Sequence, residues 1–189
     1  IREMAERITH RGPDSEGIYC GDGMTMGFRR LSIIDLEAGN QPLYNEDKTL
    51  VLMFNGEIYN YQPLREELLA AGHMFATASD SEVLLHGVEE WGEALLSRLR
   101  GMFAFAIWNT QEHTLFLARD PFGIKPMHYT TLADGSFVFA SEIKSMLAHP
   151  HFVKTFNKRA LDGYLSFQYA VPKETFFEGV YCLPPAHFL

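Results

Sequence analysis

Short apolar runs rich in aromatic and β-branched residues recur along the chain, and Gly, Asp, Asn or Pro bounds each of them. Runs of this length and composition are typical of β-strands. They predict strands at Glu16–Cys20, Met24–Phe28, Leu31–Ile34, Thr49–Phe54, Met102–Trp108, Thr114–Ala118, Met127–Thr130 and Phe137–Ala140. In Met102–Trp108 both alternating sets of side chains are apolar, so we expect this strand to be buried on both faces.

Helical periodicity is confined to a few segments. One helix is expected at 63–71, where Gly72 suits the position after the last turn. A second follows the capping-box sequence Ser79–Glu82. Its apolar face comprises Val83, Leu84, Val88, Trp91 and Leu95. Shorter helices are expected at the first residues, at Glu142–Ala148 and at Lys158–Leu165. Runs of strands with few helices predict an α+β fold rather than alternating βαβ units.

Composition narrows the class of protein. The 189 residues are 47% hydrophobic and 21% charged, which predicts one soluble globular domain. The formal charge of −8 and the lack of a basic stripe argue against a nucleic-acid partner. We expect no membrane partner and a cytoplasmic location, since no apolar run could span a bilayer and no signal peptide is recognisable. Cys20 and Cys182 are expected to be reduced thiols, and no Cys/His spacing indicates a metal site.

Asn55-Gly56 has two interpretations. Asn-Gly between apolar runs is the strongest short signal for a hairpin turn, and judged locally this is the favoured interpretation. The functional alternative is an oxyanion hole, in which the Asn amide and the next backbone N–H donate to one developing negative oxygen. Glycine at position 56 would let the backbone approach a ligand closely.

Other motifs are equally ambiguous when taken singly. Arg30, at the mouth of a short buried strand, could bind a carboxylate through two parallel hydrogen bonds, although a surface arginine is more common. Asp80 could accept from a ligand ammonium while the segment also caps a helix. His10–Asp14 is typical of a turn, and Arg119–Pro126 of a loop that needs no ligand.

The order of these motifs is more informative. From His10 onward the chain resembles the class II glutamine amidotransferases, and among them most closely the asparagine synthetase branch. The resemblance rests on His-Arg-Gly-Pro-Asp at 10–14, Arg-Leu-Ser-Ile-Ile-Asp at 30–35, Gln-Pro-Leu at 41–43, Phe-Asn-Gly-Glu-Ile-Tyr-Asn-Tyr at 54–61, Ser-Asp-Ser-Glu at 79–82, Gly-Met-Phe-Ala-Phe-Ala at 101–106 and Arg-Asp-Pro-Phe-Gly-Ile-Lys-Pro at 119–126. Glucosamine phosphate synthase and phosphoribosyl-pyrophosphate amidotransferase share the Asn-Gly element but match less well. Paralogues that amidate other carboxylates share the motifs, so the acceptor stays open.

The resemblance implies an N-terminal-nucleophile hydrolase fold, a four-layer αββα sandwich of antiparallel sheets. It implies that residues 1–189 are a single glutamine amidotransferase type 2 domain. In the family, an N-terminal cysteine attacks the side-chain amide of glutamine and its own α-amine is the base. The thioester is then hydrolysed to glutamate, and the released ammonia serves to convert aspartate to asparagine.

Site residues carry over by position. Asn55 and Gly56 would form the oxyanion hole, Arg30 would bind the α-carboxylate of glutamine, and Glu57 and Asp80 its α-ammonium. Backbone groups of Leu31, Ile33 and Ile34 would complete the pocket.

The nucleophile is not in this sequence, because Cys20 and Cys182 are internal and have no free α-amine. Two alternatives stay open. Either the parent protein carries the cysteine strand ahead of Ile1, which we favour, or the chain is a non-catalytic glutamine-binding module. The expected partners are glutamine, a C-terminal synthetase domain and a second copy in a homodimer. No cofactor is expected in this domain, whereas ATP and magnesium are implied for the synthetase domain.

Overall fold

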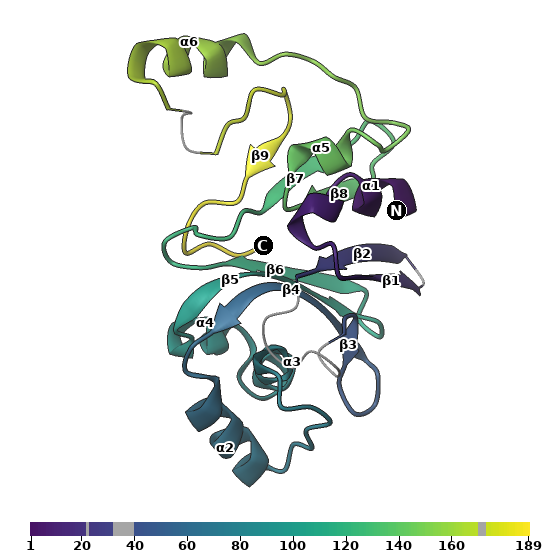
Figure 1. Ribbon diagram of the computed structural model, residues 1–189, viewed down its shortest axis with the longest axis vertical. Coiled ribbons are helices and arrows are strands. Elements are labelled where there is room, and N and C mark those ends of the chain that lie inside the picture. Colours follow the sequence, from purple (N-terminus) through teal and green to yellow (C-terminus); the bar gives the residue numbers. More distant parts are fainter. Residues whose placement is uncertain (22, 32–39, 170–172) are drawn as a thin grey trace.

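A four-stranded antiparallel sheet forms the centre of the computed structural model, which describes residues 1–21, 23–31, 40–169 and 173–189 (Figure 1). The strands, in the order in which they pair, are β3 Leu43–Tyr44, β4 Leu50–Ile58, β5 Gly101–Asn109 and β6 Thr114–Arg119. β4 and β5 pair over their full lengths, from Leu50 opposite Asn109 to Ile58 opposite Gly101. This long pairing makes them the rigid element on which the rest of the domain is built.

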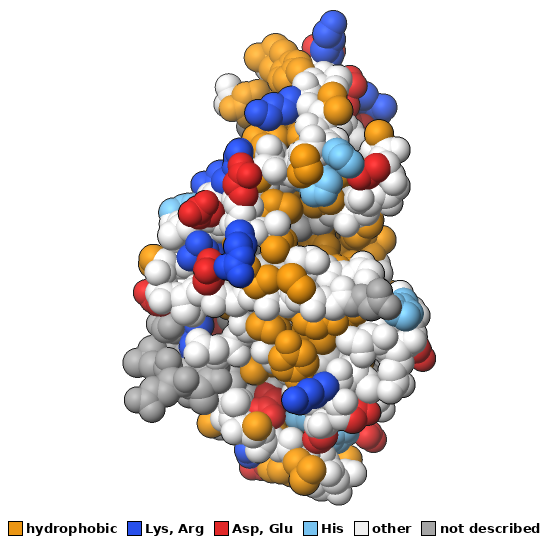
Figure 2. All heavy atoms as spheres, turned by 90° about the vertical axis from the view of Figure 1, so that its right-hand side faces the viewer, with side chains coloured by type: hydrophobic (Ala, Val, Ile, Leu, Met, Phe, Trp, Pro, Cys, Tyr) orange, Lys and Arg blue, Asp and Glu red, His pale blue; other side chains and the backbone are white. Residues whose placement is uncertain are grey.

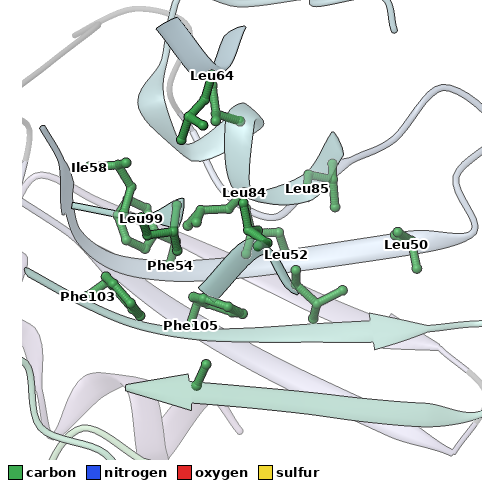
Figure 3. Packing of buried hydrophobic residues seen from close by; sticks show 14 of the residues in the cluster. Leu50, Leu52, Phe54, Ile58, Leu64, Leu84, Leu85, Leu99, Phe103 and Phe105 are labelled. Carbon is green, nitrogen blue, oxygen red and sulfur yellow. The ribbon is translucent and has the colours of Figure 1, made fainter. Parts of the chain in front are cut away.

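Both faces of this sheet are buried. On one face the side chains pack against helices (Figure 3), and they include Leu52, Phe54, Phe103 and Phe105. On the other face they pack against a second layer of strands, and they include Val51, Met53, Ala104 and Ala106. The prediction that Met102–Trp108 is buried on both faces is therefore confirmed.

The second layer consists of two smaller antiparallel sheets. One pairs β1 Ser15–Gly21 with β2 Met24–Arg30, and the other has the order β8–β7–β9, with β7 His128–Thr131, β8 Phe137–Ala140 and β9 Tyr181–Cys182. Two short helices, α1 Arg2–Glu6 and α5 Ile143–Met146, pack against each other and against β2 and β8 respectively. Their buried residues Met4 and Met146 form a third apolar cluster with Val138 of β8.

Helices α2 Tyr61–Ala71, α3 Asp80–Trp91 and α4 Leu95–Arg98 cover the outer face of the central sheet (Figure 1). Together with α1 and α5 they complete the four-layer arrangement of helices, sheet, sheets and helices, so the predicted αββα sandwich is confirmed. The remaining helices are η1 Thr9–Arg11, η2 Gly92–Ala94 and α6 Lys158–Phe167, the last of which lies apart at the upper end of Figure 1. Among the residues that the structure describes, no helix has both the length and the apolar character needed to cross a bilayer.

Helix ends follow the sequence signals in part. Gly72 ends α2 in the left-handed conformation, with φ of 107°, and the Ser79 hydroxyl accepts from the Ser81 N–H at 3.2 Å to cap α3. Glu82 does not complete the capping box. Its carboxylate accepts instead from the backbone N–H groups of Ala76 and Thr77, at 2.6 and 2.8 Å.

The structure differs from the sequence-based expectations for one turn and for several strands. The expected hairpin turn at Asn55-Gly56 is wrong, because both residues lie inside β4 and pair with Ala104 and Phe103 of β5. The short strands β3 and β9 had no sequence signal. Of the strand predicted at 31–34, Leu31 lies outside any strand and the other positions fall outside the described residues.

Candidate active site

A cavity of about 420 Å³ opens where the end of β2, the middle of β4 and the first turn of α3 meet. It brings together residues from distant parts of the sequence, from His10 to Lys125. Its lining includes the predicted site residues Arg30, Leu31, Asn55, Gly56, Glu57 and Asp80. The predicted contributions of Ile33 and Ile34 lie outside the described residues.

Arg30 is the last residue of β2 and is only 7% exposed. Its Nη1 donates to the Asn40 side-chain oxygen at 3.0 Å, and its carbonyl accepts from the Asp14 N–H at 3.0 Å. Gly12 lies so close to this strand that an added Cβ would come within 2.3 Å of the Arg29 carbonyl carbon. The His10–Asp14 segment is thus the turn that the sequence suggested, and it also holds the end of β2 at the cavity.

Asp80 begins α3 and is 5% exposed. Its Oδ2 accepts from the Ile58 N–H at 2.8 Å, which ties the helix start to the end of β4. Burial raises the pKa of this carboxyl, and the neighbouring charge of Glu57 raises it further, although the hydrogen bond from Ile58 opposes them. A ligand cation between Asp80 and Glu57 would stabilise the ionised Asp80 carboxylate and offset the repulsion between the two acids. The pair is therefore suited to an ammonium group.

Asn55 and Gly56 lie in β4 and line the same cavity as Arg30 and Asp80. Gly56 has φ of +156°, and an added Cβ would come within 2.1 Å of the Met102 carbonyl oxygen. Only glycine therefore fits this approach of β4 to β5. Among the described residues, the Asn55 side-chain amide has no hydrogen-bond partner, so its donors remain available to a ligand in the cavity.

Gln41 is a site residue to which the sequence analysis assigned no role. Its side-chain nitrogen donates to the Phe54 carbonyl at 2.9 Å, and its side-chain oxygen accepts from the Phe54 N–H at 2.6 Å. A primary amide carries both a donor and an acceptor. The Gln41 side chain therefore makes with Phe54 the two hydrogen bonds that a backbone residue of β3 would make if that strand started earlier. Gln41 thereby positions the residue that precedes Asn55.

One wall of the cavity is formed by His10 and Arg11, which both bind Glu142. The Glu142 carboxylate lies 3.0 Å from His10 Nε2, 3.0 Å from Arg11 Nη1 and 3.2 Å from Lys144 Nζ. Burial alone would raise the pKa of Glu142, but hydrogen bonds from Arg11, His10 and Lys144 lower it from 4.5 to about 2. The ionised carboxylate is therefore much more stable here than in the unfolded chain.

This shift predicts acid sensitivity. Because the folded pKa lies below the unfolded value, the stabilisation is complete above about pH 4.5 and is lost as the pH falls toward about 2. Glu142→Gln should lower the free energy of unfolding by about 1–2 kcal/mol at pH 6, allowing for partial solvent screening, and hardly at all near pH 2. Urea unfolding of both proteins at a series of pH values tests this. If the difference in the free energy of unfolding between the two proteins is the same at every pH, the prediction is wrong.

The loop Arg119–Pro126 forms another part of the site through Lys125, which lines the cavity. Arg119 donates to the carbonyls of Gly123 and Lys125, both at 2.7 Å, and to that of Leu183 at 2.5 Å. The loop is therefore held by hydrogen bonds from Arg119 to its own carbonyls and to Leu183.

Neither cysteine lines this cavity. Cys20 is exposed on β1, and Cys182 is half-buried on β9 beside Arg119. Both are free thiols, as expected. A second cavity of about 450 Å³ runs between β2 and β8. It shares the lining residues Arg11, Phe28, Arg29, Phe54 and Asn55 with the first, so Asn55 lies where the two meet.

Solved structures show the same fold. The glutamine phosphoribosylpyrophosphate amidotransferase from Bacillus subtilis, complexed with ADP and GMP, matches 82% of this chain and 42% of its own, with a TM-score of 0.63 and 22% identity. A structure titled as the allosteric regulatory enzyme of purine biosynthesis matches 65% of this chain and 28% of its own, with a TM-score of 0.52 and 29% identity. These likenesses support the N-terminal-nucleophile hydrolase fold.

Sequence comparison is more specific. The glutamine amidotransferase domain family matches residues 1–189. The glutamine-hydrolysing asparagine synthetases 1 and 2 of Bacillus subtilis are 52% and 46% identical over 93% and 100% of this chain, and the matches span 27% and 26% of their own lengths. A putative glutamine-hydrolysing asparagine synthetase of Mycobacterium tuberculosis is 45% identical over 95% of the chain and is matched over 29% of its length. The chain therefore spans less than a third of these relatives; it belongs to the glutamine amidotransferase domain family and corresponds to the glutaminase part of glutamine-hydrolysing asparagine synthetases.

Proposed function

We propose that the cavity binds L-glutamine and that the domain hydrolyses its side-chain amide to glutamate and ammonia. The observation that carries this proposal is the convergence of three kinds of group on one cavity. Arg30 suits a carboxylate, Glu57 and Asp80 suit an ammonium, and Asn55 with Gly56 suits a carbonyl oxygen that gains negative charge. Glutamine carries all three groups on one short chain.

In this mechanism Arg30 and the acidic pair hold the α-carboxylate and α-ammonium, so the side-chain amide lies beside Asn55. A thiolate attacks the amide carbon, and the carbonyl oxygen becomes an oxyanion that accepts hydrogen bonds from the Asn55 amide and the Gly56 backbone. The C–N bond then breaks with proton transfer to nitrogen, which releases ammonia and leaves a thioester for water to hydrolyse. Since neither Cys20 nor Cys182 lines the cavity, the thiolate comes from a cysteine outside these 189 residues.

The role of the parent protein extends the proposal. The relatives are named glutamine-hydrolysing asparagine synthetases. We therefore propose that ammonia released here serves a synthetase domain that converts aspartate to asparagine. The use of ATP and magnesium by that domain, a cytoplasmic location and a homodimer belong to the same proposal and rest on the family resemblance. Another carboxylate acceptor would fit this domain equally well. A second candidate function is that of a glutamine-binding module without hydrolysis, which applies if the parent protein brings no cysteine to the cavity, because neither Cys20 nor Cys182 lines it.

Glutamine binding tests the site directly. Arg30→Lys removes the planar fork of the guanidinium but keeps its charge, and Asp80→Asn keeps an acceptor for the Ile58 N–H but removes the negative charge. Each should weaken L-glutamine binding about 10–100-fold, because a charged hydrogen bond contributes about 1.5–3 kcal/mol. Isothermal titration calorimetry measures the change.

Matched controls are available on α6, far from the cavity. Arg159→Lys and Asp162→Asn alter exposed side chains of the same types and should leave glutamine binding unchanged. Normal binding by both cavity variants, with circular dichroism showing an intact fold, would refute the site assignment. Binding without glutamate release, in a protein that carries the N-terminal cysteine, would favour the binding module.

A further inference from the structure

A second group of chemically reactive side chains lies on the helical face of the central sheet, where α2, α3 and β3 are neighbours (Figure 1). Glu46 follows β3, His73 follows α2, and His86 and Glu89 lie on successive turns of α3. One nitrogen or carboxylate oxygen from each of the four residues falls within 4.8 Å of all the others. In Figure 2, histidine and acidic side chains lie beside one another near this lower end of the molecule.

His86 is the buried member of the group. It is 1% exposed, and neither of its ring nitrogens forms a hydrogen bond. Its Nδ1 faces the carboxylates of Glu46 and Glu89 at 3.5 and 3.7 Å, which is too long for a good hydrogen bond. A buried polar atom without a partner is destabilising, so this arrangement points to a group that would lie between the nitrogen and the two carboxylates.

The Nε2 atoms of the two histidines have other carboxylate neighbours. Nε2 of His73 lies 3.2 Å from Glu90, and Nε2 of His86 lies 3.5 Å from Glu82. Glu82 is itself held by backbone N–H groups. Carboxylates in these positions favour a proton on Nε2 and leave the Nδ1 lone pairs directed into the group, as in metal-bound imidazoles with supporting carboxylates.

The distances fit one ion. Zinc binds nitrogen and oxygen ligands at about 2.0–2.2 Å, so ligand atoms at the corners of a tetrahedron lie about 3.3–3.5 Å apart. Here Nδ1 of His73 lies 3.9 and 3.8 Å from Glu46 and Glu89, and Nδ1 of His86 lies 3.5 and 3.7 Å from the same two residues. Glu46 offers Oε1 to His73 and Oε2 to His86, and one atom from each of the four residues lies within 4.8 Å of the others, so the side chains must close around the ion to bind it.

We propose that Glu46, His73, His86 and Glu89 bind one divalent first-row transition metal ion, with Zn²⁺ as the best fit to two imidazoles and two carboxylates. Four protein ligands make a closed site, which is typical of structural rather than catalytic zinc. The ion would join the turn after β3, the end of α2 and the middle of α3. It would also compensate the carboxylates that surround the two imidazoles.

Calorimetric titration with Zn²⁺ tests the proposal, and Cys20→Ser in every variant removes the exposed thiol as a competing ligand. We expect one Zn²⁺ per chain. At a free concentration of about 100 times Kd, the ion should raise the unfolding temperature by about 5–10 °C. Co²⁺ in place of Zn²⁺ should give the intense visible absorption of a tetrahedral site.

The less buried ligands provide the decisive variants, since His86→Gln could unfold the core. His73→Gln and Glu89→Gln should each weaken Zn²⁺ binding at least about 10–100-fold, the effect of losing even a supporting residue. His151→Gln is the matched control, because exposed His151 contacts a single carboxylate, that of Asp134, and its loss should leave binding unchanged. Absence of saturable binding, or equal binding by wild type and both ligand variants, would refute the site and leave a cluster of ion pairs.

Discussion

Asn55→Ala should lower kcat for glutamine hydrolysis about 10²–10³-fold while changing KM only slightly. The Asn55 amide has no hydrogen-bond partner among the described residues, so removing it breaks no hydrogen bond within them. Its proposed partner is the oxyanion that forms during attack on the glutamine amide. An interaction made mainly in the transition state affects kcat rather than substrate affinity. Glutamate release, measured in a protein that carries the N-terminal cysteine, gives both constants.

Asn109→Ala is the matched control for this experiment. Asn109 is the last residue of β5 and does not line the cavity. Its side chain accepts from the N–H groups of Gln111 and Glu112, both at 3.0 Å. It should cost some stability and leave kcat unchanged. If Asn55→Ala retains kcat within about threefold of wild type, Asn55 does not bind the oxyanion. A large rise in KM with unchanged kcat would make it a substrate-binding residue instead.

Much of the fold was predictable because its strands follow a local pattern. β1, β5 and β6 were predicted within one residue at each end, since their alternating or doubly apolar runs end at Gly, Asp or Asn. The two buried faces of β5 were also evident from its sequence alone. β3 and β9 are two residues long, so neither carries a periodic signal, and both exist only through pairing with a longer neighbour.

Asn55-Gly56 shows how a strong local preference can be overruled. The dipeptide favours a turn, but nine consecutive pairs with β5 keep β4 extended through it. Glycine here serves the close approach to Met102 rather than a hairpin. Asn55 and Gly56 gave a wrong local prediction of a turn, but they still contributed to the predicted site. The site prediction rested on the order of several motifs along the chain rather than on this dipeptide alone.

Convergence in space could not be derived from sequence spacing. Arg30 and Asp80 line one cavity because β2 and the start of α3 both lie against β4, with Asp80 bound to the last residue of that strand; this is a property of the topology. Nothing in the sequence around Gln41 indicates that its side-chain amide forms hydrogen bonds with the Phe54 backbone. The cluster of Glu46, His73, His86 and Glu89 comes from three separate segments of the chain, so no Cys/His spacing in the sequence indicated a metal site there.

Asp120→Ala should lower the free energy of unfolding by at least about 3 kcal/mol, although the residue contacts no proposed ligand. The side chain is completely buried and accepts from the N–H groups of Phe122, Ile124 and Lys125 at 3.0 Å and from Phe103 at 3.3 Å. Burial by itself would raise the pKa of this carboxyl, but these four donors more than offset it and lower the pKa. Alanine would leave several buried donors without an acceptor, at about 1–3 kcal/mol for each that water cannot reach.

The loss should appear as a fall in unfolding temperature of about 6–12 °C at neutral pH, followed by circular dichroism. Asp120→Asn keeps one acceptor oxygen and should be intermediate. Asp47→Ala is the control, because Asp47 is exposed in a surface turn, where it accepts from the Thr49 N–H and hydroxyl and water can replace the lost oxygen. If Asp120→Ala and Asp47→Ala have the same unfolding temperature, the four hydrogen bonds do not hold the loop. A large fall confined to Asp120→Ala would mean that the loop carrying Lys125 to the cavity depends on one buried carboxylate.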